Sequence, residues 1–328
     1  MRYFILSDVH ANREALQAVL EDMKLFQPRF RGSVSNASLA HEDHEPTPCP
    51  LPGGELASAH RLDSSPPGRG EGVGESMESG SRATADALVN LGDTIGYMPH
   101  PNEVMDILWP VCDLILPGNH DLEVAHLFHA SEQEARLLRA RYNEQAAWSL
   151  EWTKRALAPR NLDRLTALSQ RQRFLFRKDH LLFAHASPVL PERMYYIDGT
   201  MAARELFFSH QQFDGTIAFV GHIHVPQLYI REPKGILGGR LRFEPPKVAP
   251  SGPIEKRWPV KKGETVLVVV PSVGQPRDGL YYAGYAVYDD STEELIMRRV
   301  PYDVIVTQSE MRALDFPPKL WGRLARGI

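Results

Sequence analysis

Five short polar runs, each directly after an apolar run, hold residue types that commonly bind metal ions. They contain Asp8 and His10, then Asp93, then Asn119, His120 and Asp121, then His185, and finally His222 and His224. The apolar runs are predicted to be short strands, and in open α/β folds the carboxyl ends of strands form the ligand crevice. One polar run could arise by chance, but five together predict a shared metal site.

The spacing inside these runs has a geometric meaning. In an extended segment, residues i and i+2 point the same way, so Asp8 and His10 can reach one metal ion. A turn at Gly221 can direct His222 and His224 into one site, because glycine allows close backbone approach. Mixed imidazole and carboxylate ligands favour Mn, Fe, Zn or Ni over Ca. Taken singly, each motif is more typical of a turn or cap.

The elements that must position these residues are strands and helices in alternation in the first part of the chain. In the later part, strands predominate. An amphipathic helix is predicted over residues 12–26, with Asn12 as its N-cap, and a short helix over residues 103–109. Strands are predicted over residues 3–6, 87–91, 114–116, 181–184, 217–220, 266–270, 282–288 and 295–300. This order predicts an α/β sandwich of two packed sheets with helices outside.

Three segments depart from that pattern within the single domain predicted for residues 1–328. Residues 31–85 contain 23 Ser, Gly and Pro among 55 and show no periodicity, which predicts a disordered low-complexity insertion. Residues 122–169 are predicted to be helical and to cap the site, since they follow His120 directly. Residues 231–263 are predicted to form a long surface loop or irregular hairpin.

Composition excludes several classes of protein. The chain has 37 basic and 41 acidic residues and a net charge of −4, which argues against general binding of nucleic acid or membrane surfaces. Cys49 and Cys112 cannot form a disulfide framework. The first apolar run is too short for a signal peptide, and no run reaches the length of a membrane span. A cytoplasmic protein is expected.

The five runs resemble the signature of the calcineurin-like metallophosphoesterases, D-x-H, GD, GNH(D/E), H and GHxH, in the same order. Finer features are similar to bacterial predicted phosphodiesterases and diadenosine-tetraphosphatase-like proteins, namely Asn12, the run Gly96-Tyr97-Met98-Pro99 and the block Ser272–Arg277. Relatives have an Asn-Pro-Gly-like turn before that block, where this chain has Val269-Val270-Pro271. The contribution of this loop is therefore left open.

The resemblance implies a four-layer α/β/β/α fold and a site with two divalent metal ions. Asp8, His10 and His224 would hold the first ion, Asn119, His185 and His222 the second, and Asp93 would bridge them. A bridging hydroxide would attack a small phosphorylated substrate, namely a phosphomonoester, phosphodiester or dinucleoside polyphosphate, nucleotides included. His120 would act as acid or charge stabiliser, and Asp121 would orient it or form a salt bridge elsewhere.

Two other functions fit parts of the pattern. A phosphoprotein phosphatase is disfavoured because residues 94–98 lack the Arg that grips phosphate in that branch. A non-catalytic scaffold on the same fold is disfavoured because His120 is intact. Base stacking by Tyr97, Trp148 or Trp152 is an alternative to ordinary core packing, which is the expected role of each.

Overall fold

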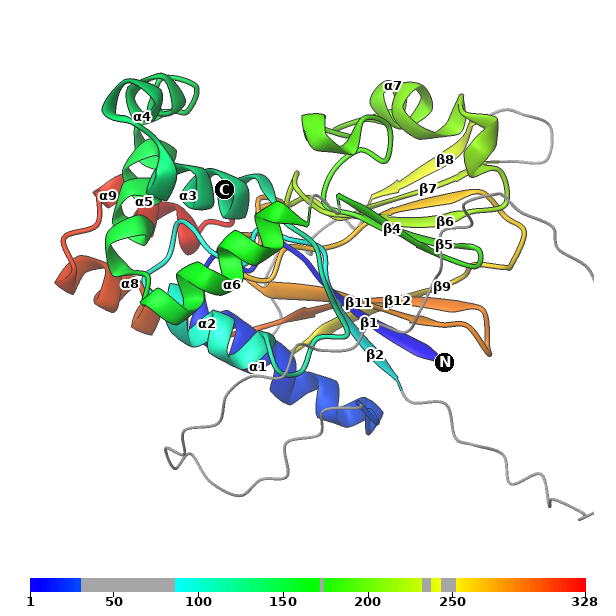
Figure 1. Ribbon diagram of the computed structural model, residues 1–328. Helices are drawn as coiled ribbons and strands as arrows, with labels where there is room; N and C mark the ends of the chain where they lie inside the picture. Colours follow the sequence, from blue (N-terminus) through cyan, green and yellow to red (C-terminus); the bar gives the residue numbers. More distant parts are fainter. Residues whose placement is uncertain (31–85, 172–173, 232–236, 243–251) are drawn as a thin grey trace, which may run out of the picture.

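The computed structural model describes residues 1–30, 86–171, 174–231, 237–242 and 252–328. Within these ranges the chain forms two six-stranded sheets with helices around them (Figure 1). The insertion predicted for residues 31–85 lies outside the described residues, as does Cys49.

The first sheet has the strand order β3-β2-β1-β11-β12-β9, and the second has the order β4-β5-β6-β10-β7-β8. The first contains β1 (Arg2–Leu6), β2 (Ala87–Asn90), β3 (Leu114–Ile115), β9 (Ile254–Pro259), β11 (Ala283–Asp289) and β12 (Glu294–Val300). The second contains β4 (Leu175–Lys178), β5 (Leu181–Ala184), β6 (Ile217–Val220), β7 (Gln227–Arg231), β8 (Leu237–Arg242) and β10 (Val266–Val269).

Parallel pairing brings the predicted polar runs to matching strand ends. β1, β2 and β3 are parallel, with Leu6 opposite Asn90 and Asn90 opposite Ile115. In the second sheet β5, β6 and β10 are parallel as well. The chain therefore leaves each set of three strands at one edge of its sheet, and five of these six exits carry the predicted polar runs.

The two sheets pack face to face because their strands are apolar on both sides. Along β1, Tyr3 and Ile5 join the cluster between the sheets, whereas Phe4 and Leu6 join the cluster under helices α1 (Arg13–Met23) and α8 (Val304–Ala313). This alternation is the two-residue period of a strand. On the outer face of the second sheet, residues such as Val220 pack against Phe207, after the short helix α7 (Thr200–Ala203). The predicted α/β/β/α arrangement is confirmed.

Between β3 and β4 the chain is helical, in agreement with the prediction for residues 122–169. The helices are α3 (Asn119–His129), α4 (Glu132–Arg139), α5 (Glu144–Ala156) and α6 (Pro159–Gln170), and Figure 1 shows them grouped beside the two sheets. They enclose a cluster that includes Ile95 and Met105, the latter on α2 (Pro101–Leu108). A capping role for these helices stays a prediction.

Two parts of the C-terminal half differ from the sequence prediction. A long surface loop or irregular hairpin was predicted over residues 231–263; where the chain is described, β8 pairs with β7 as an antiparallel hairpin with a register shift, whereas β9 is a strand of the first sheet that was not predicted. β9 is an edge strand whose residues alternate between half-buried and exposed, so it lacks the apolar run of a central strand. Helices α8 and α9 (Pro318–Leu324) follow β12, where no element was predicted.

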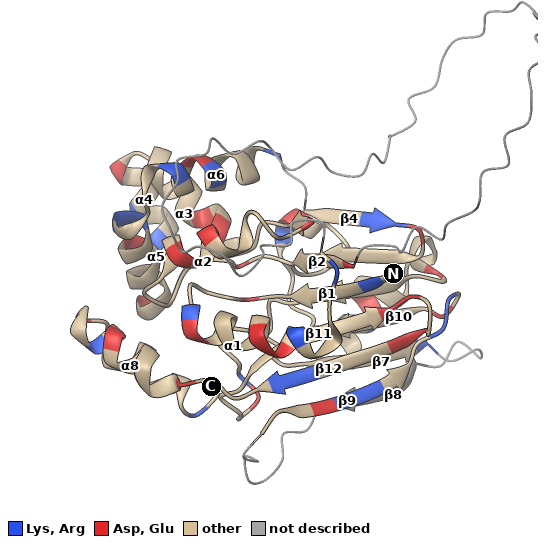
Figure 2. Cartoon of the chain, turned by 90° about the horizontal axis from the view of Figure 1, so that it is seen from below, with Lys and Arg blue, Asp and Glu red and all other residues tan. Residues whose placement is uncertain are grey.

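Charges are interspersed over the elements, as the composition indicates. Figure 2 shows basic and acidic residues mixed along the helices and on the strands. In the parts of the chain that the structure describes, no helix is both long and apolar enough to cross a membrane.

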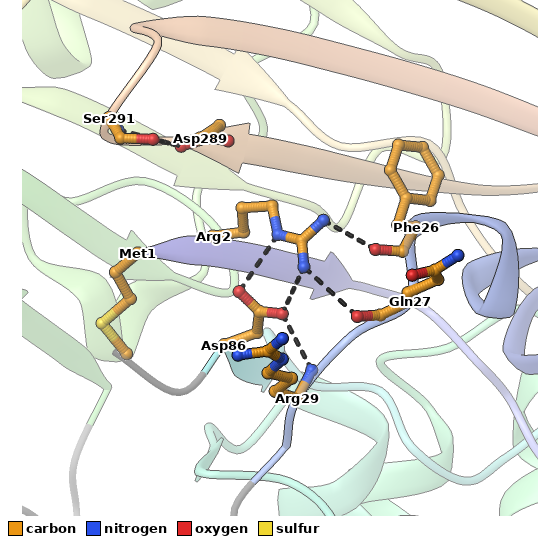
Figure 3. Close-up of a pocket in the computed structure, with 8 residues that line it drawn as sticks. All are labelled: Met1, Arg2, Phe26, Gln27, Arg29, Asp86, Asp289 and Ser291. Atoms are coloured by element: carbon orange, nitrogen blue, oxygen red, sulfur yellow. Dashed lines mark hydrogen bonds and ion pairs between the residues drawn. The ribbon is translucent and has the colours of Figure 1, made fainter. Parts of the chain in front are cut away.

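The two ends of the 31–85 segment are tied together at the amino ends of β1 and β2. Phe30 and Asp86 pair as a parallel bridge, and the Asp86 amide donates to the Arg29 carbonyl at 2.9 Å. The Arg2 guanidinium donates to both carboxylate oxygens of Asp86, at 3.1 and 2.7 Å, and to the carbonyl of Phe26 (Figure 3). A cavity of about 450 Å³ opens there, at the opposite end of these strands from the polar runs.

Candidate metal centre

The polar runs from both sheets converge on two groups of donor atoms that share Asp93. The first donor group consists of Asp8, His10, Asp93 and His224, and the second of Asp93, His185 and His222. Within each group the donor atoms lie within 4.8 Å of one another, and every residue is buried. The structure therefore brings together all the predicted His and Asp ligands, and it divides them as the resemblance implied.

Close contacts define the centre of each group. In the first, His10 Nε2 lies 3.2 Å from His224 Nε2, which lies 3.4 Å from Asp8 Oδ1. In the second, His185 Nε2 lies 3.2 Å from His222 Nδ1. Asp93 Oδ2 lies 3.6 Å from both His10 Nε2 and His185 Nε2. One carboxylate oxygen thus faces both groups.

Hydrogen bonds on the far side of the rings fix which nitrogen faces the centre. His10 Nδ1 lies 3.3 Å from the Ile95 carbonyl, and His224 Nδ1 lies 2.6 Å from the Gln275 carbonyl. A carbonyl can only accept, so each Nδ1 carries the proton and each Nε2 presents a lone pair. This is the usual outer support of a metal-binding histidine.

The backbone at the site is not extended, which corrects the spacing argument made from the sequence. Asp8, His10, Asp93, His222 and His224 all have positive φ, at 53°, 50°, 51°, 68° and 59°. Non-glycine residues adopt this left-handed conformation only at some cost, and such residues cluster at functional sites. The side chains of each Asp-x-His or His-x-His run therefore converge through tight turns and not along a strand.

Glycines make room for the ligands, as predicted for Gly221. A Cβ on Gly118 would lie 2.1 Å from Asp93 Oδ1, and one on Gly221 would lie 1.8 Å from Ser7 Oγ and 2.7 Å from Asp8 Oδ2. No side chain fits at these distances, so the two glycines are required by close approach.

Burial dominates the electrostatics. It raises the pKa of Asp8 to about 7 and that of Asp93 well above its usual range. It lowers the pKa of His222 to about 4 and that of His10 well below its usual value. Neutral imidazoles are the form that binds metal, and buried carboxylates stay ionised only beside a compensating cation.

A divalent cation fits this donor set. Four imidazoles and two carboxylates match the preference of Mn, Fe, Zn or Ni, and the Asn119 Oδ1 atom, predicted as a further ligand, is buried and has no hydrogen-bond partner in the described ranges. An orphaned acceptor of this kind is costly unless something binds it. The buried His and Asp groups can therefore hold metal ions.

His120 lies beside the donor groups and belongs to neither. Its ring is 4.9 Å from that of His10 and 4.4 Å from that of Tyr97, and its Nδ1 has no hydrogen-bond partner among the described residues. Burial and, next in size, the charge of Arg277 lower its pKa to about 3. Its backbone N–H donates to Asp93 Oδ1 at 2.8 Å, which fixes the shared carboxylate.

Asp121 does not orient His120 through any contact that the structure describes. Its carboxylate accepts the backbone N–H groups of Gly118, Thr94 and Ile95, at 3.0, 3.2 and 3.1 Å. It thereby joins the turn after β2 to the start of α3. These bonds make Asp121 a residue that holds the ligand loops, instead of the expected partner of His120.

The three aromatic residues considered for base stacking all pack against other rings, and a fourth, Tyr196, lies at the site. Trp148 and Trp152 each lie 4.7 Å from the Phe316 ring, so they pack in the core. Tyr97 is buried against His10 and His120. Tyr196, which the sequence did not single out, stacks on His222 at 4.1 Å although the residue is 57% exposed. No sequence motif marks it, because it lies in an irregular loop.

A third group of donor atoms lies elsewhere and is already neutralised. Glu14, His100 and Glu310 come together between α1 and α8. The Arg13 guanidinium lies 2.7 Å from Glu14 and 3.0 Å from Glu310, and His100 Nε2 lies 2.5 Å from Glu310. These ion pairs hold the helices together, and the group needs no metal ion.

Comparison with known proteins agrees with this geometry. The family model of the calcineurin-like phosphoesterases matches residues 71–226. An uncharacterized protein of Methanocaldococcus jannaschii is 27% identical over 237 residues, which are 72% of this chain and 85% of that protein. The crystal structure of a metallophosphoesterase from Sphaerobacter thermophilus is 25% identical, has a TM-score of 0.64, and is matched over 100% of this chain and 99% of that chain.

A second crystal structure, of hypothetical protein PH1004 from Pyrococcus horikoshii, has the same fold. It is 14% identical, with a TM-score of 0.60 over 100% of this chain and 98% of that chain. The matches confirm the resemblance to the calcineurin-like phosphoesterases and the metallophosphoesterase fold. The family implies metal-dependent hydrolysis of a phosphoester.

Proposed function

We propose that the protein is a binuclear metal-dependent phosphoesterase that hydrolyses a phosphomonoester, a phosphodiester or a dinucleoside polyphosphate. The observation that carries the proposal is the sharing of Asp93 Oδ2, 3.6 Å from an imidazole nitrogen of each donor group. A shared carboxylate is what holds two metal ions as a pair.

The chain's residues divide into two sets of ligands and a substrate-facing group. Asp8, His10 and His224 would hold one ion, and Asn119, His185 and His222 the other. Two divalent ions held there supply positive charge that stabilises the charge developing on a transferring phosphoryl group. Mn is the ion we propose to test first.

His120 would act on the substrate directly. Its Nδ1 is unpartnered in the described part of the chain and its ring lies beside both His10 and Tyr97. From that position it would donate a proton to the leaving oxygen or stabilise charge on the phosphoryl group. A scaffold protein would have no need of a histidine here.

The test is a substrate screen of the Mn-loaded protein. Aryl phosphomonoesters, aryl phosphodiesters, dinucleoside polyphosphates and phosphopeptides are offered at equal concentration, with and without a chelator. We expect chelator-sensitive hydrolysis of at least one of the first three. Hydrolysis of phosphopeptides alone would favour a protein phosphatase, and none at all in a metal-loaded protein would favour a scaffold.

A further inference from the structure

The block Ser272–Arg277, whose contribution the sequence left open, is fastened to the metal centre. It follows β10, and the Gly274 amide donates to the Asp8 carbonyl at 2.9 Å, as does Ser272 Oγ at 3.0 Å. The Asn12 side chain donates to the Gly274 carbonyl at 2.8 Å. A Cβ on Gly274 would lie 1.8 Å from the Val9 carbonyl oxygen, so only glycine allows this docking.

Gln275 connects this loop both to a ligand and to a cation. Its backbone carbonyl fixes His224, and its side-chain Oε1 accepts from Arg277 Nε and Nη2 at 3.3 and 2.7 Å. Its Nε2 is buried and has no hydrogen-bond partner among the described residues. A buried amide donor left unpaired in this way is expected to have a ligand as its partner.

Arg277 brings an unneutralised charge to the site. Its backbone N–H donates to the His224 carbonyl at 3.1 Å, and its guanidinium contacts the neutral Gln275 side chain. Among the salt bridges of the described residues, none involves this guanidinium. The Arg277 N–H and the Gln275 carbonyl both bond to His224, which places this segment beside the metal centre. After burial, the charge of Arg277 is the next cause that lowers the pKa values of His120 and His222.

A second guanidinium lies on the same side. The end of helix α9 meets the loop, because the Gly279 amide donates to the Gly327 carbonyl at 2.9 Å. Arg323, on α9, is half-buried and donates through Nε to the main-chain oxygen of Ile328. Burial lowers the pKa of Arg323, and the nearby charge of Arg277 is the next cause. Among the described residues, no Asp or Glu side chain pairs with either arginine.

We propose that Gln275, Arg277 and Arg323 form an anion-binding wall that takes a second phosphate group of the substrate, next to the one being hydrolysed. The inference rests on the proposed function and narrows it to substrates with linked phosphates, such as nucleoside polyphosphates. Two guanidinium groups without Asp or Glu partners repel each other, and an anion with several charged oxygens relieves this repulsion. The unpaired Gln275 amide supplies a further donor.

The test measures binding to the full-length, Mn-loaded protein by calorimetry, with two probes. Methylenediphosphonate is a non-hydrolysable pair of linked phosphates, and inorganic phosphate is the single group. Arg277→Gln is expected to weaken diphosphonate binding about 10- to 100-fold, the loss for hydrogen bonds to a charged group. Phosphate binding should change less than about 3-fold, because the metal centre that holds it is intact. Arg323→Gln should also weaken diphosphonate binding.

Controls separate specific contacts from general charge. Arg326→Gln removes an exposed guanidinium three residues from Arg323 and should leave both affinities unchanged. Arg277→Lys keeps the charge without the planar fork and should recover only part of the binding. Metal content and melting temperature show that each variant is folded and loaded, and Arg323→Gln still decides the question if Arg277→Gln fails to fold.

Two results would overturn the wall. One is equal loss of both probes in Arg277→Gln, which would place the guanidinium on the phosphate held by the metals. The other is a loss of diphosphonate binding in Arg326→Gln as large as that in Arg277→Gln, which would make the effect a general one of charge. Because binding is measured without turnover, a protein that discriminates between the probes but hydrolyses no ester would refute the proposed function and leave the wall standing.

Discussion

Asp93→Asn is expected to weaken both metal ions at once while hardly changing the shape of the site. Asp93 Oδ1 accepts the His120 backbone N–H at 2.8 Å and lies against Gly118, so the side chain is held in place. An asparagine keeps that bond through its carbonyl oxygen. Its Nδ2 then faces His10 and His185, and an amide nitrogen carries hydrogens where a metal ligand needs a lone pair.

The size of the effect follows from the shared position. Removal of a residue that hydrogen-bonds to a metal ligand, without itself binding the metal, costs about 10–100-fold in metal affinity. Asp93 is proposed to bind both ions directly. Each affinity should therefore fall by at least that factor. Hydrolysis should fall by more than about 100-fold at limiting Mn, because both ions are needed. Metal content after dialysis against graded Mn, with aryl phosphate hydrolysis, measures both.

Asp86→Asn is the matched control. Asp86 precedes the same strand, β2, and is also buried, but it lies at the other end and binds Arg2. Its loss should cost about 1–3 kcal/mol of stability, as for a hydrogen bond to a charged group, and no metal. If Asp93→Asn lost one ion only, or kept two ions with full activity, the shared-ligand model would be refuted.

Three further perturbations test other parts of the molecule. His120→Ala should keep the metal content and lower kcat about 10²–10⁴-fold on poor leaving groups but less on nitrophenolate esters, and equal loss on both would contradict an acid role. Replacing residues 31–85 by a few Gly and Ser should leave kcat and metal content unchanged and add up to about 1–2 kcal/mol of stability, because the joined ends are already paired; inactivity of a folded, loaded deletion would contradict this. Asp22→Asn should cost about 3–5 kcal/mol in urea unfolding, because its buried carboxylate binds Arg298 at 2.6 and 2.7 Å and Tyr285 at 2.7 Å; a loss under about 1 kcal/mol would refute it.

The clustering of the candidate ligands could be predicted from the sequence because each of them lies just after a strand that is easy to recognise. The runs before Asp8, Asp93 and His222 are short, apolar and rich in branched residues, and parallel pairing brings their ends together. The signature then divides the ligands between two ions. Neither step requires knowledge of how distant segments pack.

The elements that were not predicted correctly depend on tertiary contacts. β9 has no apolar run, since only one side of an edge strand is covered, so its pattern is typical of a loop. Helix α8 has a local signal, Asp303, whose carboxylate accepts the Ile305 and Val306 amides at 3.1 and 3.3 Å. That N-cap could have been recognised from the sequence.

Asn12 shows where prediction from local pattern ends. Its Oδ1 accepts the Ala15 amide at 3.1 Å, which is the N-cap that the sequence predicts from residues three positions apart. Its Nδ2 donates to Gly274 at 2.8 Å, across 262 residues, and no spacing rule contains that bond. The same side chain therefore starts the first helix and fastens the loop that carries Gln275 and Arg277. The first contact is local and the second is tertiary. For the same reason, the sequence could predict that the candidate metal ligands cluster but not which cations lie beside them.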